Sequence, residues 1–264
     1  MIPVALTIAG SDPSGGAGLQ ADLKTFHQFG VYGEAVVTLI TVQNTRSVTR
    51  VETLDPELVL EQIRAVCSDI PPRAAKTGAL GSRVLVEAIA AEAESFRFPL
   101  VVDPVMISKH GAPLMSEDAQ RALVERLLPR AFLLTPNLHE AGALAGFVVE
   151  DRDAMFRAAE KLVSLGAANV LVKGGHLQGE AVDVLCMRDA GFLEYTADRI
   201  DTPHTHGTGC TYSAAITAEL AKGTPLADAV KRAKAFVTEA IRTNPGLGGG
   251  SGPLNHHATT HHAR

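Results

Sequence analysis

The sequence has few cysteines, no excess of positive charge and no long apolar segment. Its three cysteines, Cys67, Cys186 and Cys210, stand far apart without CxxC spacing, which argues against a disulfide framework or a structural zinc site and favours a reducing compartment. A formal net charge of -5 gives no basic footprint for nucleic acid. No apolar run reaches the roughly 18 residues that a membrane helix needs, and the first residues lack a secretory pattern. We therefore expect a cytoplasmic protein that binds neither nucleic acid nor membrane.

The length and composition predict one α/β domain. The 264 residues, of which 46% are hydrophobic and 20% charged, can bury a large core. No linker or repeat interrupts the chain, so we predict a single domain over residues 1–264. The composition changes only in a tail from about residue 244, whose glycines indicate either a mobile end or backbone lying close to a ligand. We expect the tail histidines to face solvent rather than bind a metal; they are His256, His257, His261 and His262.

Strand-like and helix-like segments alternate along the chain. Short runs rich in β-branched residues end in polar or glycine-rich turns, and stretches with helical spacing follow them. This order is typical of an α/β fold with a mainly parallel central sheet flanked by helices. Predicted strands cover residues 4–8, 35–42, 48–53, 74–76, 100–103, 132–135 and 170–173, with a hairpin at 182–187 and 192–196. Predicted helices cover 18–29, 57–67, 209–222 and 225–243, with others beginning near 82, 116, 137 and 151.

A glycine-rich segment, HGTGCT (206–211), opens one of the predicted helices. The first N–H groups of a helix have no acceptor inside the helix, and the helix dipole adds positive potential. Gly207, Thr208, Gly209 and Cys210 can therefore form a cradle for an anion. An ordinary helix start, capped by Thr208, explains the same residues equally well. Neither a GxxxxGK[ST] loop nor a dinucleotide fingerprint occurs in the sequence.

Cys210 lies at the mouth of this helix, where the positive end of the dipole should favour the thiolate. We interpret it as a candidate acceptor of a proton from a substrate hydroxyl. The alternative is that Cys210 is a small buried packing residue, which is the commoner role of a lone cysteine.

Several polar residues follow predicted strands, where parallel sheets bind ligands. Asn137 and Glu140, three positions apart, can offer an amide and a carboxylate to a hydrated metal, but the pair also fits a helix capping box. Asp103 is a second candidate carboxylate or an ordinary strand-end aspartate. Lys173 can offset phosphate charge. Gln43 offers both a hydrogen-bond donor and an acceptor, or is simply an exposed strand end.

Three other polar residues stay outside the candidate site. Asp12 is best explained as a cap of the glycine-rich turn that follows it. Lys234, on the last predicted helix, fits a solvated helix face at least as well as a position near a nucleotide. His206 can contact a phosphate or stabilise its turn.

Six motifs then occur in order along nearly the whole chain: GSDPSGGAGLQADLKTF (10–26), VQNT (42–45), VVDPVM (101–106), TPNLHEA (135–141), VKGGH (172–176) and HGTGCTYSAA (206–215). In this order they resemble the hydroxymethylpyrimidine/phosphomethylpyrimidine kinases of thiamine biosynthesis. That family belongs to the pyridoxal kinase branch of the ribokinase-like superfamily. Six ordered matches are a much more specific signal than any one of them.

The resemblance implies a ribokinase-like three-layer fold and a homodimer. It also implies two ATP-dependent phosphorylations, first of 4-amino-5-hydroxymethyl-2-methylpyrimidine and then of its monophosphate. The nucleotide would contact Lys173 and Asn137, and Mg²⁺ would be held by Glu140 and Asp103. Catalysis would depend on the 207–210 segment, and the pyrimidine would lie against Gln43, Ala17 and Val105. Ala79 stands where the family sometimes has methionine, which leaves the fit to the ring open.

Two other functions are compatible with these motifs. A pyridoxal kinase would need the same fold, ATP and magnesium. A noncatalytic vitamin or nucleotide sensor could retain the pocket, although the intact GTGC segment and Glu140 argue against it.

Overall fold

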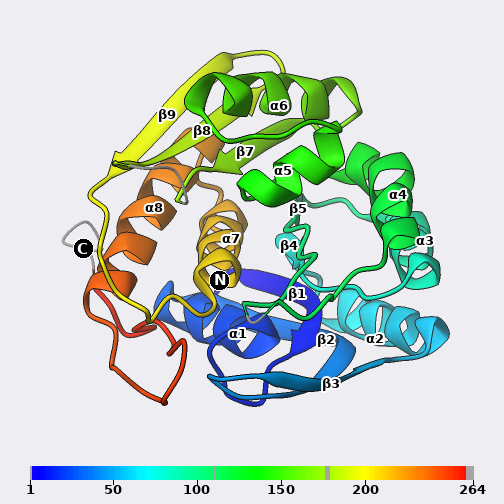
Figure 1. The fold of residues 1–264 in the computed structure, drawn as a ribbon. Coiled ribbons are helices and arrows are strands. Elements are labelled where there is room, and N and C mark those ends of the chain that lie inside the picture. Colours follow the sequence, from blue (N-terminus) through cyan, green and yellow to red (C-terminus); the bar gives the residue numbers. More distant parts are fainter. Residues whose placement is uncertain (1, 110, 176–178, 260–264) are drawn as a thin grey trace.

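The computed structural model describes residues 2–109, 111–175 and 179–259. Within these residues, nine strands form one sheet (Figure 1). Its strands are β1 (Val4–Ser11), β2 (Tyr32–Gln43), β3 (Val48–Thr53), β4 (Ala74–Thr77), β5 (Leu100–Val102), β6 (Leu133–Leu134), β7 (Asn169–Lys173), β8 (Ala181–Met187) and β9 (Gly191–Ala197). They lie in the order β3-β2-β1-β4-β5-β6-β7-β8-β9.

Most of the sheet is parallel, as predicted. The strands from β2 across to β7 run in one direction, whereas β3, β8 and β9 are antiparallel to their neighbours. The predicted edge strand and the predicted hairpin are these antiparallel strands. Some boundaries differ: β2 begins at Tyr32 rather than Ala35, and the regular part of β6 is only two residues long.

Helices cover both faces of the sheet, which confirms the predicted three-layer α/β architecture. They are α1 (Gly18–Gln28), α2 (Pro56–Asp69), α3 (Arg83–Glu92), α4 (Glu117–Ala122), α5 (Leu138–Ala145), α6 (Arg152–Ser164), α7 (Thr208–Ala221) and α8 (Leu226–Arg242). Short 3₁₀ or π turns follow α3 and α4. Helices α1, α7 and α8 lie on one face, and α2 to α6 lie on the other (Figure 1).

The hydrophobic cores on the two faces of the sheet follow from the alternation of side chains along each strand. In β5, Leu100 and Val102 pack into the core under α2 to α6, and Val101 between them packs into the core under α7 and α8. Successive residues of a strand point to opposite faces, so an uninterrupted apolar run indicates a strand that is covered on both sides.

Helix α7 occupies the middle of its layer. Its residues from Thr211 to Glu219 are buried all round, and most of them are small. A helix that is covered on every side cannot be moved without disturbing its neighbours, namely α1, α8 and the sheet. Its N-terminus is therefore held rigidly at one edge of the sheet.

The tail packs against the body of the protein up to residue 259. Ser251 N–H donates to the Thr45 carbonyl at 2.8 Å, and Leu254 is buried in the core under α7 and α8. The expectation that the tail histidines face solvent is wrong for His256, which is 7% exposed and lies 3.2 Å from the Thr211 hydroxyl. His257 is exposed as expected, and His261 and His262 lie outside the described residues.

His256 makes the stability of the fold depend on pH. Burial, with the nearby charge of Lys24, lowers the pKa of His256 from 6.5 to about 4. The pKa of His256 is lower in the folded than in the unfolded chain, so below pH 6.5 the unfolded chain binds a proton that the folded chain does not. The resulting loss in the free energy of unfolding is absent above pH 6.5, grows as the pH falls and reaches about 3 kcal/mol near pH 4. We expect urea unfolding of His256→Gln to lose most of this dependence between pH 7 and pH 4.5.

The matched control for that experiment is His257→Gln, which changes an exposed histidine one position away. Its unfolding should follow the wild-type pH dependence. An unchanged acid limb in His256→Gln would show that the decline arises from other groups.

In the described ranges, no helix combines the length and the apolar character needed to cross a membrane.

Candidate active site

Polar residues from five parallel strands meet at one edge of the sheet. Asp12 follows β1, Gln43 ends β2, Asp103 follows β5, Asn137 lies just beyond β6, and Lys173 ends β7. Parallel strands bring their carboxyl ends to the same edge, so the sequence positions converge in space.

These residues and the start of α7 line one pocket of about 1490 Å³, which is larger than the roughly 300–1,000 Å³ typical of a single-ligand site. The candidate site residues from the sequence all line it: Ala17, Gln43, Asp103, Val105, Asn137, Glu140, Lys173, Gly207, Thr208, Gly209 and Cys210.

Gly207 is the N-cap of α7 and adopts a left-handed conformation, with φ at 81°. A Cβ at this position would collide with the Gly16 carbonyl oxygen. The interpretation of Thr208 as the cap is therefore wrong. Thr208 is the first helical residue, and its hydroxyl donates to the Thr205 carbonyl at 2.8 Å instead of capping the helix. Glycine is needed here because the loop at Gly16 approaches the helix start so closely.

Within the part of the chain that the structure describes, two main-chain N–H groups at this helix start have no hydrogen-bond acceptor. The Thr208 N–H donates to the Thr205 carbonyl at 3.3 Å, so it is already used. Among the residues that the structure describes, no acceptor faces the N–H of Gly209 or Cys210. A Cβ on Gly209 would lie 3.4 Å from Lys173 Nζ and 3.8 Å from Asp103 Oδ2. The positive end of α7 thus faces the charged groups of the sheet edge.

Lys173 and Asp103 form a buried ion pair at that edge. Lys173 Nζ donates to Asp103 Oδ1 at 2.9 Å, and Asp103 also accepts from Thr135 at 3.1 Å and from Ser213 at 3.2 Å. Burial alone would lower the pKa of Lys173 and raise that of Asp103. Their mutual attraction outweighs both effects, so the pKa of Lys173 is raised and that of Asp103 is lowered.

Asn137 and Glu140 do form the capping box that was the alternative interpretation of this pair. Asn137 Oδ1 accepts from the Glu140 N–H at 2.9 Å, and Glu140 Oε2 accepts from the Asn137 N–H at 2.8 Å. Burial raises the pKa of Glu140 to about 7, and the charge of Asp103 adds to this against the opposing effect of Lys173. Capping and a site role are compatible, because both residues also line the pocket.

The expectation of a thiolate at Cys210 is wrong for the protein without ligands. Burial, together with the charges of Asp22 and Asp103, raises the pKa of Cys210 to about 12, although Lys76 and the Gly18 N–H act in the opposite direction. The helix terminus was visible in the sequence, but the two carboxylates come from distant segments. Near neutral pH the group is a thiol.

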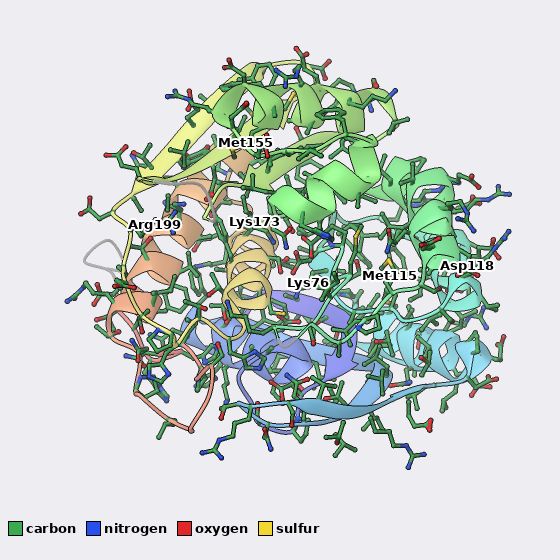
Figure 2. All side chains as sticks on the ribbon, in the orientation of Figure 1. Lys76, Met115, Asp118, Met155, Lys173 and Arg199 are labelled. Carbon is green, nitrogen blue, oxygen red and sulfur yellow. The ribbon has the colours of Figure 1, made fainter. Side chains whose placement is uncertain are left out.

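Sequence reasoning missed a buried ion pair beneath the pocket. Lys76 Nζ donates to Asp22 Oδ1 at 2.7 Å, the Thr7 hydroxyl donates to Asp22 Oδ2 at 2.6 Å, and both ionic side chains are fully buried. Lys76 lies near the centre of the molecule beside α7, as does Lys173 (Figure 2). Burial alone would lower the pKa of Lys76, but the charge of Asp22 outweighs it and raises that pKa. The signal was a lysine inside the small, buried AAKT run of β4.

Lys234 was also misjudged. It is buried rather than solvated, lines the pocket and donates to Asp183 Oδ2 at 2.7 Å. The partner lies on β8, 51 positions away in the sequence. A lysine on an amphipathic helix gives no local sign of such a partner.

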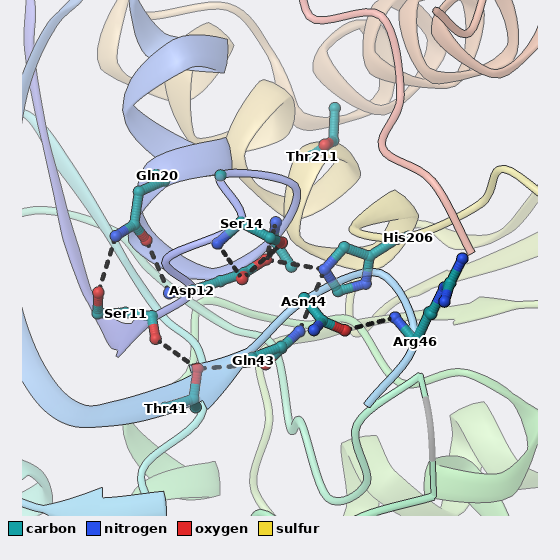
Figure 3. Close-up of polar contacts among 12 residues, drawn as sticks. Ser11, Asp12, Ser14, Gln20, Thr41, Gln43, Asn44, Arg46, His206 and Thr211 are labelled. Carbon is teal, nitrogen blue, oxygen red and sulfur yellow. Dashed lines mark hydrogen bonds and ion pairs between the residues drawn. The ribbon is translucent and has the colours of Figure 1, made fainter. Parts of the chain in front are cut away.

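Asp12 caps the glycine-rich turn between β1 and α1, as predicted. Its carboxylate accepts from the N–H groups of Ser14 and Ala17, each at 2.9 Å (Figure 3). It also contacts His206 Nε2 at 2.8 Å, so the turn is tied to the start of α7. The amide of Gln43 contacts the same ring nitrogen at 3.2 Å (Figure 3).

The sequence matches the family model for phosphomethylpyrimidine kinase over residues 12–255. The chain belongs to the phosphomethylpyrimidine kinase family. It is 48% identical over 259 residues to the hydroxymethylpyrimidine/phosphomethylpyrimidine kinase of Rhizobium meliloti, covering 97% of each chain. It is 49% identical over 253 residues to a thiamine biosynthesis bifunctional protein of Geobacter sulfurreducens, covering 95% of this chain. The chain spans about half the length of that bifunctional relative, 51%.

Members of this family share their fold with pyridoxal kinases. The structure superimposes on an ADP complex of Bacillus subtilis pyridoxal kinase with a TM-score of 0.91 at 40% identity, covering 98% of both chains. The ribokinase-like fold expected from the motifs is thereby confirmed. The fold alone does not distinguish a pyrimidine substrate from pyridoxal. The relative from Rhizobium meliloti is named a pyrimidine kinase, whereas the Bacillus subtilis protein with the same fold is a pyridoxal kinase.

Proposed function

We propose that this protein transfers the γ-phosphoryl group of ATP to 4-amino-5-hydroxymethyl-2-methylpyrimidine and then to the resulting monophosphate, in thiamine biosynthesis. The observation that carries the proposal is that Gly209 and Cys210, whose N–H groups have no acceptor among the described residues, line the same pocket as the neutral amide of Gln43. One end of the pocket suits a phosphoryl group and the other suits an uncharged heterocycle. The name of the Rhizobium meliloti relative supports both substrates, and that of the Geobacter sulfurreducens relative supports thiamine biosynthesis.

Phosphoryl transfer requires an aligned acceptor and compensation of the charge on the phosphate oxygens. In the proposed mechanism, the N–H groups of Gly209 and Cys210 donate to the oxygens of the transferring group. Lys173 compensates its charge, and Asn137 lies beside the nucleotide. Gln43 holds the heterocycle by its polar edge, while Ala17 and Val105 exclude water around the ring. Catalysis then depends mainly on preorganised dipoles, which need no rearrangement during the reaction.

Magnesium is part of this proposal, and Glu140 and Asp103 would hold it. Within residues 2–109, 111–175 and 179–259, no group of three or more His, Cys, Asp or Glu side chains could hold a metal ion. Mg²⁺ does not need such a cage, because it usually binds one or two carboxylates together with substrate phosphates and water. Burial, with a smaller contribution from the charge of Asp103, raises the pKa of Glu140 to about 7, and two carboxylates lining one pocket fit a hydrated cation. When bound, the ion would neutralise charge that develops on the phosphates.

Competition between substrates tests the assignment. Purified protein offered equal concentrations of the pyrimidine and pyridoxal, with ATP, should show the higher kcat/KM for the pyrimidine. A higher value for pyridoxal would reassign the substrate but not the kinase chemistry. Tight binding of either compound without an ATP-dependent product, measured by mass spectrometry, would indicate a sensor instead.

We further propose that Cys210 accepts the proton of the substrate hydroxyl. Cys210→Ala should lower kcat about a hundredfold while KM for ATP stays within about twofold. The pKa of Cys210 is about 12, so at any pH well below 12 the thiolate fraction increases about tenfold for each unit by which the pH rises. Between pH 7.5 and 9, above the pKa of about 7 of Glu140, the wild-type kcat/KM should therefore rise about tenfold per unit, and that of Cys210→Ala should stay flat. A flat wild-type profile would remove this role and leave the kinase assignment intact.

The remaining expectations belong to the same proposal. The protein acts as a single ribokinase-like domain, forms a homodimer and works in the cytoplasm. Sedimentation of the purified protein tests the dimer.

A further inference from the structure

We propose that Asp12 and His206 form a positioning pair that fixes the orientation of the Gln43 side-chain amide. The pair thereby sets the order in which Gln43 presents its acceptor and its donor to the bound heterocycle. This inference rests on the proposed function, because Gln43 is the pyrimidine contact only there.

The Asp12 carboxylate can only accept. It is 3% exposed, and it accepts from the Ser14 N–H at 2.9 Å, the Ser14 hydroxyl at 2.7 Å and the Ala17 N–H at 2.9 Å. Burial alone would raise the pKa of Asp12, but the hydrogen bonds from His206 and Ser14 outweigh it and lower that pKa. Near neutral pH the group is therefore an ionised acceptor.

The role of His206 Nε2 follows from that of Asp12. This nitrogen lies 2.8 Å from Asp12 Oδ2 and 3.2 Å from the Gln43 amide. A histidine ring nitrogen either carries a proton and donates or lacks one and accepts. Facing an ionised carboxylate at 2.8 Å, Nε2 must carry the proton. It therefore cannot accept a hydrogen bond from Gln43.

Thr41 imposes the same orientation from the other side of Gln43. Its hydroxyl donates its only proton to the Ser11 carbonyl at 2.9 Å, so toward Gln43 the Thr41 Oγ1 atom can only accept. The end of the Gln43 amide placed as Oε1 lies 3.3 Å from this oxygen. Thr41 thus requires a donor, and His206 requires an acceptor.

Both requirements are met by one orientation of Gln43. In Figure 3 the nitrogen end of the amide faces His206, which sets two N–H donors against each other. A half-turn about the last side-chain bond exchanges the two ends of the amide without moving any other atom. Gln43 Oε1 then shares the single Nε2–H of His206 with Asp12 Oδ2 in a three-centre hydrogen bond, and Gln43 Nε2 donates to Thr41 Oγ1.

The packing around the ring keeps His206 in place. The His206 N–H donates to the Gly252 carbonyl at 3.1 Å, and residue 206 pairs with Pro253 of the tail. A Cβ on Gly16 would lie 2.6 Å from His206 Cδ2. The ring is 3% exposed, so it cannot swing away to release the amide.

The orientation predicts which heterocycle edge the pocket accepts. The second lone pair of Gln43 Oε1 and the second N–H of Gln43 Nε2 remain for the ligand. The matching edge has an exocyclic amino group on the His206 side and a ring nitrogen on the Thr41 side. An edge with an oxo group and a ring N–H has the reverse order. It would set acceptor against acceptor and donor against donor.

The proton on His206 can be observed directly. Two-bond ¹H–¹⁵N spectra of the histidine-labelled protein, with the signal of His206 assigned by its loss in His206→Phe, should show Nε2 protonated at pH 7.5. An unprotonated Nε2 would overturn the proposal. This measurement needs no catalytic assay, so its failure is distinct from a failure of the proposed function.

A double-mutant cycle tests the link to Gln43. His206→Phe keeps a ring of similar shape but removes the donor, and it should raise KM for the pyrimidine about tenfold while KM for ATP stays within twofold. In a Gln43→Leu background the same change should alter KM for the pyrimidine less than twofold. The preference for the amino compound over its oxo analogue should fall about tenfold in His206→Phe. Equal effects in both backgrounds would contradict the proposal.

His204→Phe is the matched control for the cycle. His204 accepts from the Gly252 N–H at 3.2 Å, so it contacts the same tail segment as His206, but it does not line the pocket. We expect its KM for the pyrimidine to equal that of the wild type. A rise as large as that of His206→Phe would assign the effect to the tail rather than to the amide of Gln43.

Discussion

Gly207→Ala is expected to lower kcat/KM by at least about a thousandfold. A side chain at Gly207 would adopt an unfavourable left-handed conformation and collide with the Gly16 carbonyl, so the start of α7 must move. The N–H groups of Gly209 and Cys210 would move with it. Loss of one preorganised donor of this kind costs roughly a hundredfold to a thousandfold in rate. Steady-state kinetics with saturating ATP would measure the effect.

Two other glycines separate catalysis from folding in that experiment. Gly223, just after α7, has φ at 85° and open space around a Cβ, so Gly223→Ala should cost about 1 kcal/mol of stability without changing kcat/KM. Gly209→Ala should keep the melting temperature, because alanine favours a helix, but lower kcat/KM about a hundredfold, because its methyl group takes up pocket space beside Lys173 that the phosphoryl group would occupy. Wild-type kinetics in Gly207→Ala or in Gly209→Ala would contradict the role given to the helix start.

Lys173→Met is expected to reduce both activity and stability. The phosphoryl group loses a positive charge in a buried site, which should lower kcat/KM about a thousandfold. Asp103 is left as a buried carboxylate without its ammonium partner, which should destabilise the fold by about 3–5 kcal/mol. Kinetics and urea unfolding of the same preparation measure the two effects.

The double variant Lys173→Met/Asp103→Asn distinguishes the two effects. It removes both charges, and neutral replacement of a buried ion pair is often nearly neutral for stability. We expect its unfolding free energy to return toward the wild-type value while kcat/KM stays low. Recovery of activity together with stability would show that Lys173 only supports the fold.

The sequence was informative wherever a residue's role depends on its immediate neighbours. Apolar runs such as LVV of β5 indicated strands, and the residues after them, Asp103 and Lys173 among them, line the pocket. The glycines of the GTG segment indicated a helix start with special backbone needs. Asp12, in a turn rich in serine and glycine, was correctly predicted to be a turn cap.

Features that depend on distant partners could not be predicted from local pattern. Lys76 and Asp22 are 54 positions apart, and His206 and Asp12 are 194 apart, so only the fold brings each pair together. The thiolate expected at Cys210 failed for the same reason. The helix terminus was local, whereas the burial and carboxylates that raise its pKa come from other segments. His256 was likewise taken for a solvated histidine because its burial depends on where the tail packs.

The most direct test is a crystal structure of the protein with Mg²⁺, a nonhydrolysable ATP analogue and the hydroxymethylpyrimidine. We expect γ-phosphate oxygens within about 3 Å of the main-chain nitrogens of Gly209 and Cys210, with the substrate hydroxyl in line with the phosphorus. A γ-phosphate held elsewhere in the pocket, with those two nitrogens facing water, would contradict it.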